Sequence, residues 1–238
     1  MKLLAIDTSG PVCGVAVLED GRILYEGAAV NKLTHSVSLM PMVEEALNKC
    51  STDISEIELY AAVVGPGSFT GVRIGVSAVK GMAHGAGKPC VAVDALEALA
   101  WGVSLMPDLI CPIQDARAGQ VYGAAFQPGR VPQRVMEDTA AKLEDYLDQA
   151  LAAAKPEQKL CFLGDGVERY RTAIEARLGQ RAVFAPAQMS YLRPAAVAAL
   201  AWQNRENAVD YLTLQPHYLR APQAERARAA KLAAEGKA

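Results

Sequence analysis

One segment, residues 65–73 with the sequence Gly-Pro-Gly-Ser-Phe-Thr-Gly-Val-Arg, limits the folds open to this chain more than any other. It follows an apolar run over residues 59–64 and precedes a long stretch of small and apolar residues. This order is typical of a strand, a tight turn and a helix at a corner of an α/β protein. Such corners bind phosphate, build catalytic centres or set a helix against a partner.

Composition narrows the class of protein. The 238 residues are 51% hydrophobic, enough for one large or two small domains. A net charge of −2 provides no general attraction to nucleic acid or membrane. We find no apolar stretch long enough to span a bilayer, and no signal peptide at the start. Five scattered cysteines indicate reduced, buried thiols, so we expect a cytoplasmic protein.

The order of elements predicts two similar α/β lobes. Strand-Asp-turn-strand occurs at Asp7 and again at Asp115, and helices follow the strands in each half. The first half predicts strands at 3–7, 12–18, 22–30, 59–64 and 89–93. It also predicts a helix that follows the polar break at 31–32 and reaches about residue 49, and helices at about 70–86 and 94–102. The second predicts strands at 109–115, 121–126 and 159–163, and helices near 140–154, 167–178 and 194–204. We expect a first lobe at 1–104, a second, divergent lobe at 105–221, and a charged Ala-rich tail at 222–238.

The glycines after the corner favour close helix packing. Their spacing matches neither a dinucleotide fingerprint nor a Walker loop. A glycine inside a helix costs up to about 1 kcal/mol relative to alanine, so this helix must gain from close backbone approach. Its neighbour is either another helix, which we favour, or the lobe's own sheet. The predicted partner interface contains Leu39, Met40, Val43, Leu47, Thr70, Arg73, Ile74, Gly75 and Ala78.

Asp7 and Asp115 end strands at equivalent places. In duplicated ATPase-type lobes such aspartates hold a cation or orient water, and the alternative is an aspartate that starts a turn. A vestigial phosphate site would contain Asp7, Thr8, Ser9, Gly65, Gly67, Ser68 and Asp115. The three histidines lack nearby ligand partners and no G-x-S-x-G motif occurs, so the sequence predicts no metal and no catalytic residue.

Several motifs together resemble the TsaB (YeaZ) family, dimerization subunits of the bacterial tRNA threonylcarbamoyladenosine machinery. They occur in order at residues 5–9, 35–36, 64–75, 115–122 and 216–220, and the match runs from Met1 to about Glu225. One departure is Val37, where the family usually has an acidic residue. The resemblance implies duplicated RNase-H-like lobes of the actin-like ATPase (ASKHA) type. It also implies a heterodimer with the catalytic paralogue TsaD, recruitment of the ATPase TsaE, and self-association through first-lobe helices.

The resemblance further implies that TsaD catalyses the transfer reaction. It also implies that this chain contacts tRNA only indirectly, through the complex. TsaD has a His-Leu-Glu-Gly-His-type metal motif where this chain has Ala95-Leu96-Glu97-Ala98-Leu99, so both imidazoles are replaced. We therefore expect a non-catalytic subunit without a cofactor of its own, with ATP or ADP at the complex interface. The alternatives are an ATP-using ASKHA enzyme built on Asp7 and Asp115, and last a peptidase, which lacks its metal pair and nucleophile.

Overall fold

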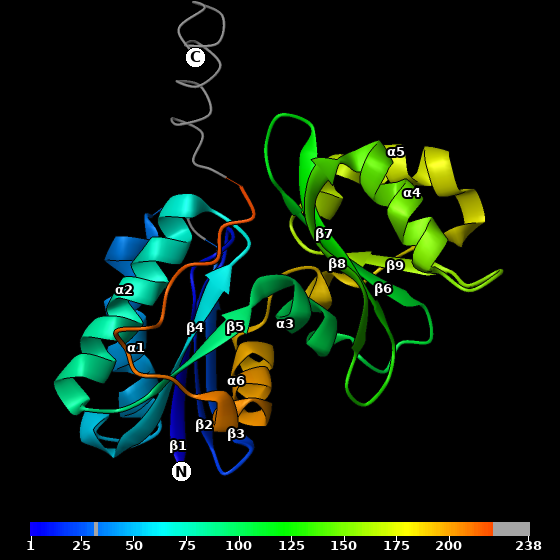
Figure 1. Ribbon diagram of the computed structural model, residues 1–238. Helices are drawn as coiled ribbons and strands as arrows, with labels where there is room; N and C mark the ends of the chain where they lie inside the picture. The colour runs from blue at the N-terminus through cyan, green and yellow to red at the C-terminus, as the bar shows by residue number, and fades with distance from the viewer. Residues whose placement is uncertain (31–32, 221–238) are drawn as a thin grey trace, which may run out of the picture.

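The computed structural model describes residues 1–30 and 33–220, so the predicted tail at 222–238 lies outside the described residues. Two α/β lobes lie side by side, each built on one five-stranded sheet (Figure 1). All five cysteines are free thiols and four are buried, as expected. Within the described ranges, no helix is long and apolar enough to cross a membrane.

The two sheets repeat one topology. In the first sheet, β1 to β3 are antiparallel neighbours, and β4 and β5 run parallel to β1, in the order β3-β2-β1-β4-β5. The second sheet has the same directions in the order β8-β7-β6-β9-β10. This duplication confirms the predicted RNase-H-like lobes of the ASKHA type. The strands are β1 Lys2–Asp7, β2 Cys13–Glu19, β3 Arg22–Ala29, β4 Ile57–Gly65, β5 Cys90–Asp94, β6 Leu109–Asp115, β7 Gln120–Gln127, β8 Gln133–Lys142, β9 Leu160–Leu163 and β10 Ala182–Phe184.

Six α-helices in the described part of the chain cover the sheets. They are α1 His35–Lys49, α2 Phe69–Ala86, α3 Ala95–Gly102, α4 Leu143–Ala153, α5 Gly166–Leu178 and α6 Pro194–Gln203. Helices α1 and α2 pack on one face of the first sheet, and α4 and α5 pack on the second sheet. The strand β8 was not predicted, because its last residues, including Ala140 and Ala141, are helix formers. Pairing of these residues with Tyr122 and Val121 of β7 overrides that preference.

Helix α6 follows the second lobe in sequence but packs on the first sheet, against β1, β2 and β3 (Figure 1). This placement differs from the predicted boundary, which put residues 105–221 in the second lobe. The physical reason is apolar burial: Val197, Leu200 and Ala201 of α6 join the core on the face opposite α1 and α2. Glu26 of β3 holds the start of α6 by accepting hydrogen bonds from Arg193 Nε and Ala195 N, both at 3.0 Å.

Residues 208–220, here called the C-terminal strap, also return to the first lobe. The strap pairs with β5 through a bridge between Val209 and Cys90. It runs beside α2, where Lys80 Nζ donates to the carbonyl oxygens of Leu212 and Leu214 at 3.3 and 3.0 Å. His217 N then donates to the Val64 carbonyl oxygen at 2.7 Å, which brings the strap to the end of β4.

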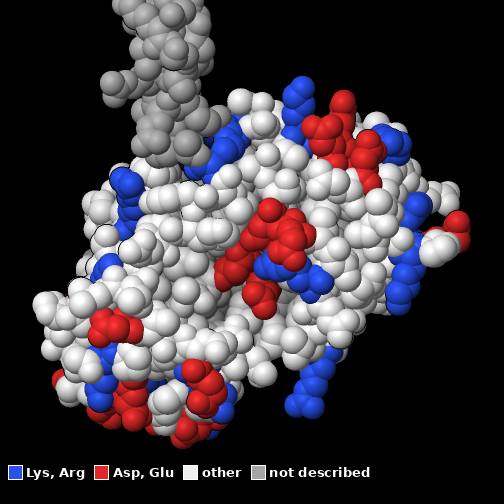
Figure 2. Space-filling view, viewed as in Figure 1, with Lys and Arg blue, Asp and Glu red and all other residues white. Residues whose placement is uncertain are grey.

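Helix α3 joins the lobes. Its buried residues pack in one core cluster with Ile110, Phe126 and Leu163 of the second sheet. Charged side chains also gather over this junction (Figure 2). Arg134 of β8 reaches across to Asp94 and Glu97, at 3.2 and 3.9 Å. Apolar packing and ion pairs therefore both connect the lobes.

Candidate functional site

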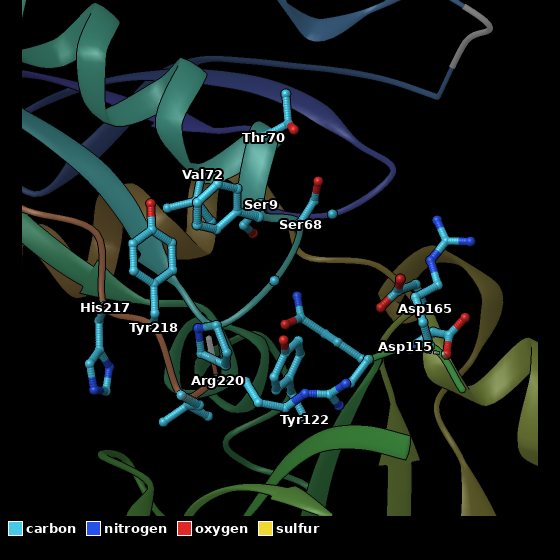
Figure 3. A pocket seen from close by; sticks show the side chains of 18 of the residues that line it. Ser9, Ser68, Thr70, Val72, Asp115, Tyr122, Asp165, His217, Tyr218 and Arg220 are labelled. Atoms are coloured by element: carbon cyan, nitrogen blue, oxygen red, sulfur yellow. Dashed lines mark hydrogen bonds between the residues drawn. The ribbon is translucent and has the colours of Figure 1, made fainter. Parts of the chain in front are cut away.

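A cleft of about 420 Å³ lies between the lobes (Figure 3). The β1–β2 turn and the Gly-Pro-Gly corner line it from the first lobe. The β6–β7 turn and the start of α5 line it from the second lobe, and the strap closes one side. Its polar lining residues include Ser9, Ser68, Thr70, Gln114, Asp115, Arg117, Tyr122, Asp165, Tyr218 and Arg220.

The glycines of the corner allow close approach of the protein's own backbone. A Cβ atom at Gly65 would stand 2.5 Å from the His217 carbonyl oxygen of the strap. A Cβ atom at Gly67 would collide with the Ser9 carbonyl oxygen, to which Ser68 N donates a hydrogen bond at 2.7 Å. The two glycines therefore seat the corner between the β1–β2 turn and the strap, and phosphate binding by them stays a prediction.

Helix α2 begins at the corner and packs directly on the end of β1. The Ser68 side chain caps it by accepting a hydrogen bond from Gly71 N at 3.2 Å. Thr8 Oγ1 donates to the Gly71 carbonyl oxygen at 2.7 Å. A Cβ atom at Gly75 would lie 2.5 Å from Thr8 Oγ1 and 3.5 Å from Ile6 Cγ2. The favoured explanation for Gly75, a closely packed partner helix, is therefore wrong: its close neighbour is the lobe's own sheet.

The other predicted interface residues divide by burial. Leu39 and Val43 are 2% and 3% exposed and belong to the core under α1. They face the sheet because they lie on the apolar side of an amphipathic helix, and they leave no surface for a partner. Leu47 is half-buried against the same core. Exposed Met40, Thr70 and Arg73, with half-buried Ile74 and Ala78, remain on the surface of α1 and α2.

Arg73 has a partner that the sequence did not indicate. Its Nε donates to the Tyr218 hydroxyl of the strap at 2.8 Å. Its guanidinium lies 3.9 Å from the centroid of the Phe69 ring, and the Phe69 and Tyr218 rings are 4.8 Å apart. Arg73 therefore helps to fasten the strap beside α2.

Three further apolar residues near α1, missed by the prediction, are exposed. Val30, Leu33 and Val37 are 61%, 59% and 58% exposed. Val37 and Met40 are three residues apart on α1 and share one side of it. Val37 stands where the family usually has an acidic residue. The structure shows that this valine is exposed on the surface next to Met40.

Asp7 and Asp115 make the same turn hydrogen bond in the two lobes. Asp7 Oδ1 accepts from Ser9 N at 2.8 Å, and Asp115 Oδ1 accepts from Arg117 N at 2.9 Å. The turn-forming role is therefore shown for both residues. Asp115 Oδ2 also accepts from Arg169 Nη1 at 3.0 Å. Asp7 is 1% exposed, and its burial raises its pKa to about 6 although Ser9 stabilises the charged form.

The sequence missed Gln114 and Arg220 as site residues, and it noted Asp165 only as part of a glycine turn. Gln114 is a buried polar residue at the end of an apolar strand. Its polar side chain in that apolar strand was the only feature of the sequence that could have marked it as a site residue. Burial, and then the Asp115 charge, raise the pKa of Asp165 to about 6. Arg220 Nη1 donates to Gln120 Oε1, while its buried Nη2 has no partner among the described residues. Figure 3 shows Arg220 beside Tyr122, and Asp165 beside Asp115.

Apolar packing fills the segment at which the resemblance implies a metal motif in the paralogue. Ala95 and Leu99 of α3 are 0% and 3% exposed, inside the core shared by the lobes. Among the described residues, one group of possible metal ligands occurs nearby, formed by Asp94, Asp138 and His217. The Arg134 guanidinium already pairs with both carboxylates, so a metal ion would compete with it there.

Comparisons with known proteins identify the family. The family model described as "TsaD: tRNA N6-adenosine threonylcarbamoyltransferase" matches residues 29–228. The tRNA threonylcarbamoyladenosine biosynthesis protein TsaB of Bacillus subtilis is 35% identical over 94% of this chain and 96% of its own length. TsaB of Haemophilus influenzae is 29% identical over 92% and 94%. The solved structure of YeaZ from Pseudomonas aeruginosa has a TM-score of 0.76 at 27% identity, covering 92% of this chain and 100% of that one. The chain therefore belongs to the TsaB (YeaZ) family of tRNA threonylcarbamoyladenosine biosynthesis proteins.

Proposed function

We propose that this protein is a non-catalytic subunit of the tRNA threonylcarbamoyladenosine modification complex. In this role it binds and supports TsaD, helps to recruit TsaE, and works in the cytoplasm. The observation that carries the proposal, beside family membership, is the apolar α3. Ala95 and Leu99 occupy the place of the paralogue's imidazoles and pack between the lobes, so no nitrogen ligand is present at those two positions.

The proposed contact surface is the outer side of α1 and α2. Val37 and Met40 are large apolar side chains at 58% and 49% exposure, and Ile74 and Ala78 of α2 are half-buried. Apolar groups at helical spacing on a surface favour a helix-to-helix contact. The partner at this surface is TsaD, or a second copy of the chain. In the face that Figure 2 shows, basic and acidic side chains are mixed, and the basic ones do not gather into a patch of the kind that binds nucleic acid directly.

A pull-down of purified TsaD by this protein, repeated with and without ATP, tests the proposal. We expect TsaD to be retained, and ATP to strengthen retention if nucleotide binds at the complex interface. Sedimentation of the protein alone over a range of concentrations then measures self-association. A chain that stays monomeric at high concentration and does not retain TsaD contradicts the proposal.

The cleft favours a second candidate function, binding or hydrolysis of ATP. Hydroxyl groups of Ser9, Ser68 and Thr70 line it, and Arg220 offers a buried N–H without a partner among the described residues. Against it, Gly65 and Gly67 contact the protein's own backbone. ATP hydrolysis by the isolated protein that is abolished by Asp7→Asn would favour this candidate, and a lack of nucleotide binding would exclude it.

A further inference from the structure

Residues 215–220 of the C-terminal strap, here called the latch, lie along the cleft and contact both lobes. Leu214, the residue before the latch, is 1% exposed and packs in the core of the first lobe. No residue of the latch itself is buried, so apolar packing contributes little to holding it in place. Segments with few buried contacts open locally at a lower free energy than the rest of a fold. A small number of polar and ring contacts therefore decide whether the latch stays closed.

The first lobe holds the latch through His217 and Tyr218. His217 N donates to the Val64 carbonyl oxygen at the end of β4, at 2.7 Å. The Tyr218 hydroxyl accepts from Arg73 Nε at 2.8 Å, and its ring lies 4.8 Å from the Phe69 ring. Tyr218 is 39% exposed and Arg73 is also exposed. Water competes for a hydrogen bond at such a place, so this attachment is reversible.

The second lobe holds the latch through Arg220. Arg220 Nη1 donates to Gln120 Oε1 at the start of β7, across the cleft from the first lobe. The buried Nη2 of the same guanidinium has no partner among the described residues. Figure 3 shows His217, Tyr218 and Arg220 following one another beside the cleft that they line. The latch is therefore fastened at both ends, once to each lobe.

The latch covers the Gly-Pro-Gly corner. The His217 carbonyl oxygen lies where a Cβ atom at Gly65 would otherwise stand, at 2.5 Å from that position. Gly65 also has a φ of +124°, a conformation that side chains rarely adopt. The open side of the corner is thus occupied by the protein's own backbone. A molecule that enters the cleft meets the latch before it meets Gly65.

We infer that the latch is a gate on the cleft, which turns about the buried anchor Leu214 and is closed in this structure. Opening breaks the attachments of Tyr218 to Arg73 and of Arg220 to Gln120, and it uncovers the Gly-Pro-Gly corner. The closed latch is an autoinhibitory contact, because it fills the approach to the corner with strap backbone. The inference is independent of the proposed assembly role, since it needs neither TsaD nor a second copy.

Hydrogen exchange of the His217 amide, followed by NMR in the full-length protein, measures opening. We expect Arg220→Gln to speed this exchange by about fivefold, because it removes one charge-assisted hydrogen bond. Gln120→Glu should slow it by a similar factor, since a carboxylate can accept from both Nη1 and Nη2 of Arg220. The control Arg130→Gln removes an exposed arginine between β7 and β8 and should leave the exchange unchanged.

A matched pair of tyrosines on the strap tests the attachment to the first lobe. Tyr218→Phe removes the acceptor for Arg73 and should speed exchange of the His217 amide. Tyr211→Phe lies before the Leu214 anchor, where its ring contacts the His84 ring at 4.7 Å, and should have no effect on the latch. Exchange of core amides in β1 should be the same in every variant, which separates opening of the latch from general destabilisation.

Thiol labelling measures access to the cleft itself. Ala116 lines the cleft at 6% exposure, and Ala116→Cys would report on entry in a Cys50→Ser background, because Cys50 is the one native cysteine that is not buried. Labelling should be faster with Arg220→Gln and slower with Gln120→Glu. Three results would overturn the gate. They are His217 exchange as slow as that of core amides, exchange that neither variant changes, or labelling that does not follow the exchange.

Discussion

Gly75 of α2 lies against Thr8 at the end of β1, so closely that a Cβ atom at position 75 would stand 2.5 Å from Thr8 Oγ1. We expect Gly75→Ala to lower the free energy of unfolding by about 1–3 kcal/mol through overpacking, and Gly75→Leu by more. Urea unfolding measures the change. Association of the protein with TsaD or with a second copy should decrease only in proportion to the loss of folded protein.

The matched control for that substitution is Gly81→Ala on the same helix. Gly81 is exposed, and a Cβ atom there would meet nothing within 4 Å. Because alanine is the better helix former, we expect a gain of up to about 1 kcal/mol. A Gly75→Ala protein with wild-type stability and lost association would restore the partner-helix explanation.

Leu99 of α3 should couple the stability of the two lobes. It is 3% exposed in the core cluster that both sheets share. We expect Leu99→Ala to cost about 2–5 kcal/mol, since it leaves a cavity at the junction. Hydrogen exchange should show lower protection in β4 and in β6 alike. Leu105→Ala, at a position 82% exposed, should change stability by less than about 0.5 kcal/mol, and equal effects would contradict the shared core.

Glu26 should make the docking of α6 sensitive to acid. Burial opposes its ionisation, but hydrogen bonds from Arg193 and from Ala195 N outweigh burial and lower the pKa of Glu26 from 4.5. A carboxyl with a lowered folded pKa stabilises the fold above its unfolded pKa. That contribution is lost as the pH falls through the folded pKa.

We therefore expect Glu26→Gln to cost about 1 kcal/mol at neutral pH, a value reduced for solvent screening. The difference from the wild type should shrink as the pH falls below 4.5, and urea unfolding at neutral pH and near pH 3 measures it. A difference that does not depend on pH would show that the ionised pair contributes nothing.

Local patterns predicted most of the fold. The apolar run before Gly65 and the Asp94 cap of α3 appear at the expected residues, because short-range propensity and capping decide them. The duplicated lobes followed from the repeat at Asp7 and Asp115. The position of α6 could not be predicted, since an apolar helix packs equally well on either sheet and only tertiary contacts choose between them.

The site residues were harder to predict from the sequence than the fold, again because tertiary contacts bring them together. Small-residue spacing showed that Gly75 has a close neighbour but not which one. Hydrophobic periodicity did not show which of two neighbouring apolar residues is buried: Met40 is 49% exposed and Leu39 is 2% exposed. The run of apolar residues is short, and a proline follows both residues. Gln114 and Asp165 are distant in the chain, and only the folded lobes bring them to one cavity.

We propose that the protein acts by binding TsaD through the outer side of α1 and α2. Calorimetric titration of TsaD with the wild type, Met40→Glu and Val131→Glu tests it most directly. Met40 and Val131 are both 49% exposed, and Val131 lies in the second lobe between β7 and β8. We predict a Kd at least about tenfold higher for Met40→Glu, a loss of about 1.4 kcal/mol, and an unchanged Kd for Val131→Glu. Wild-type affinity in Met40→Glu, or an equal loss in both variants, would contradict the account.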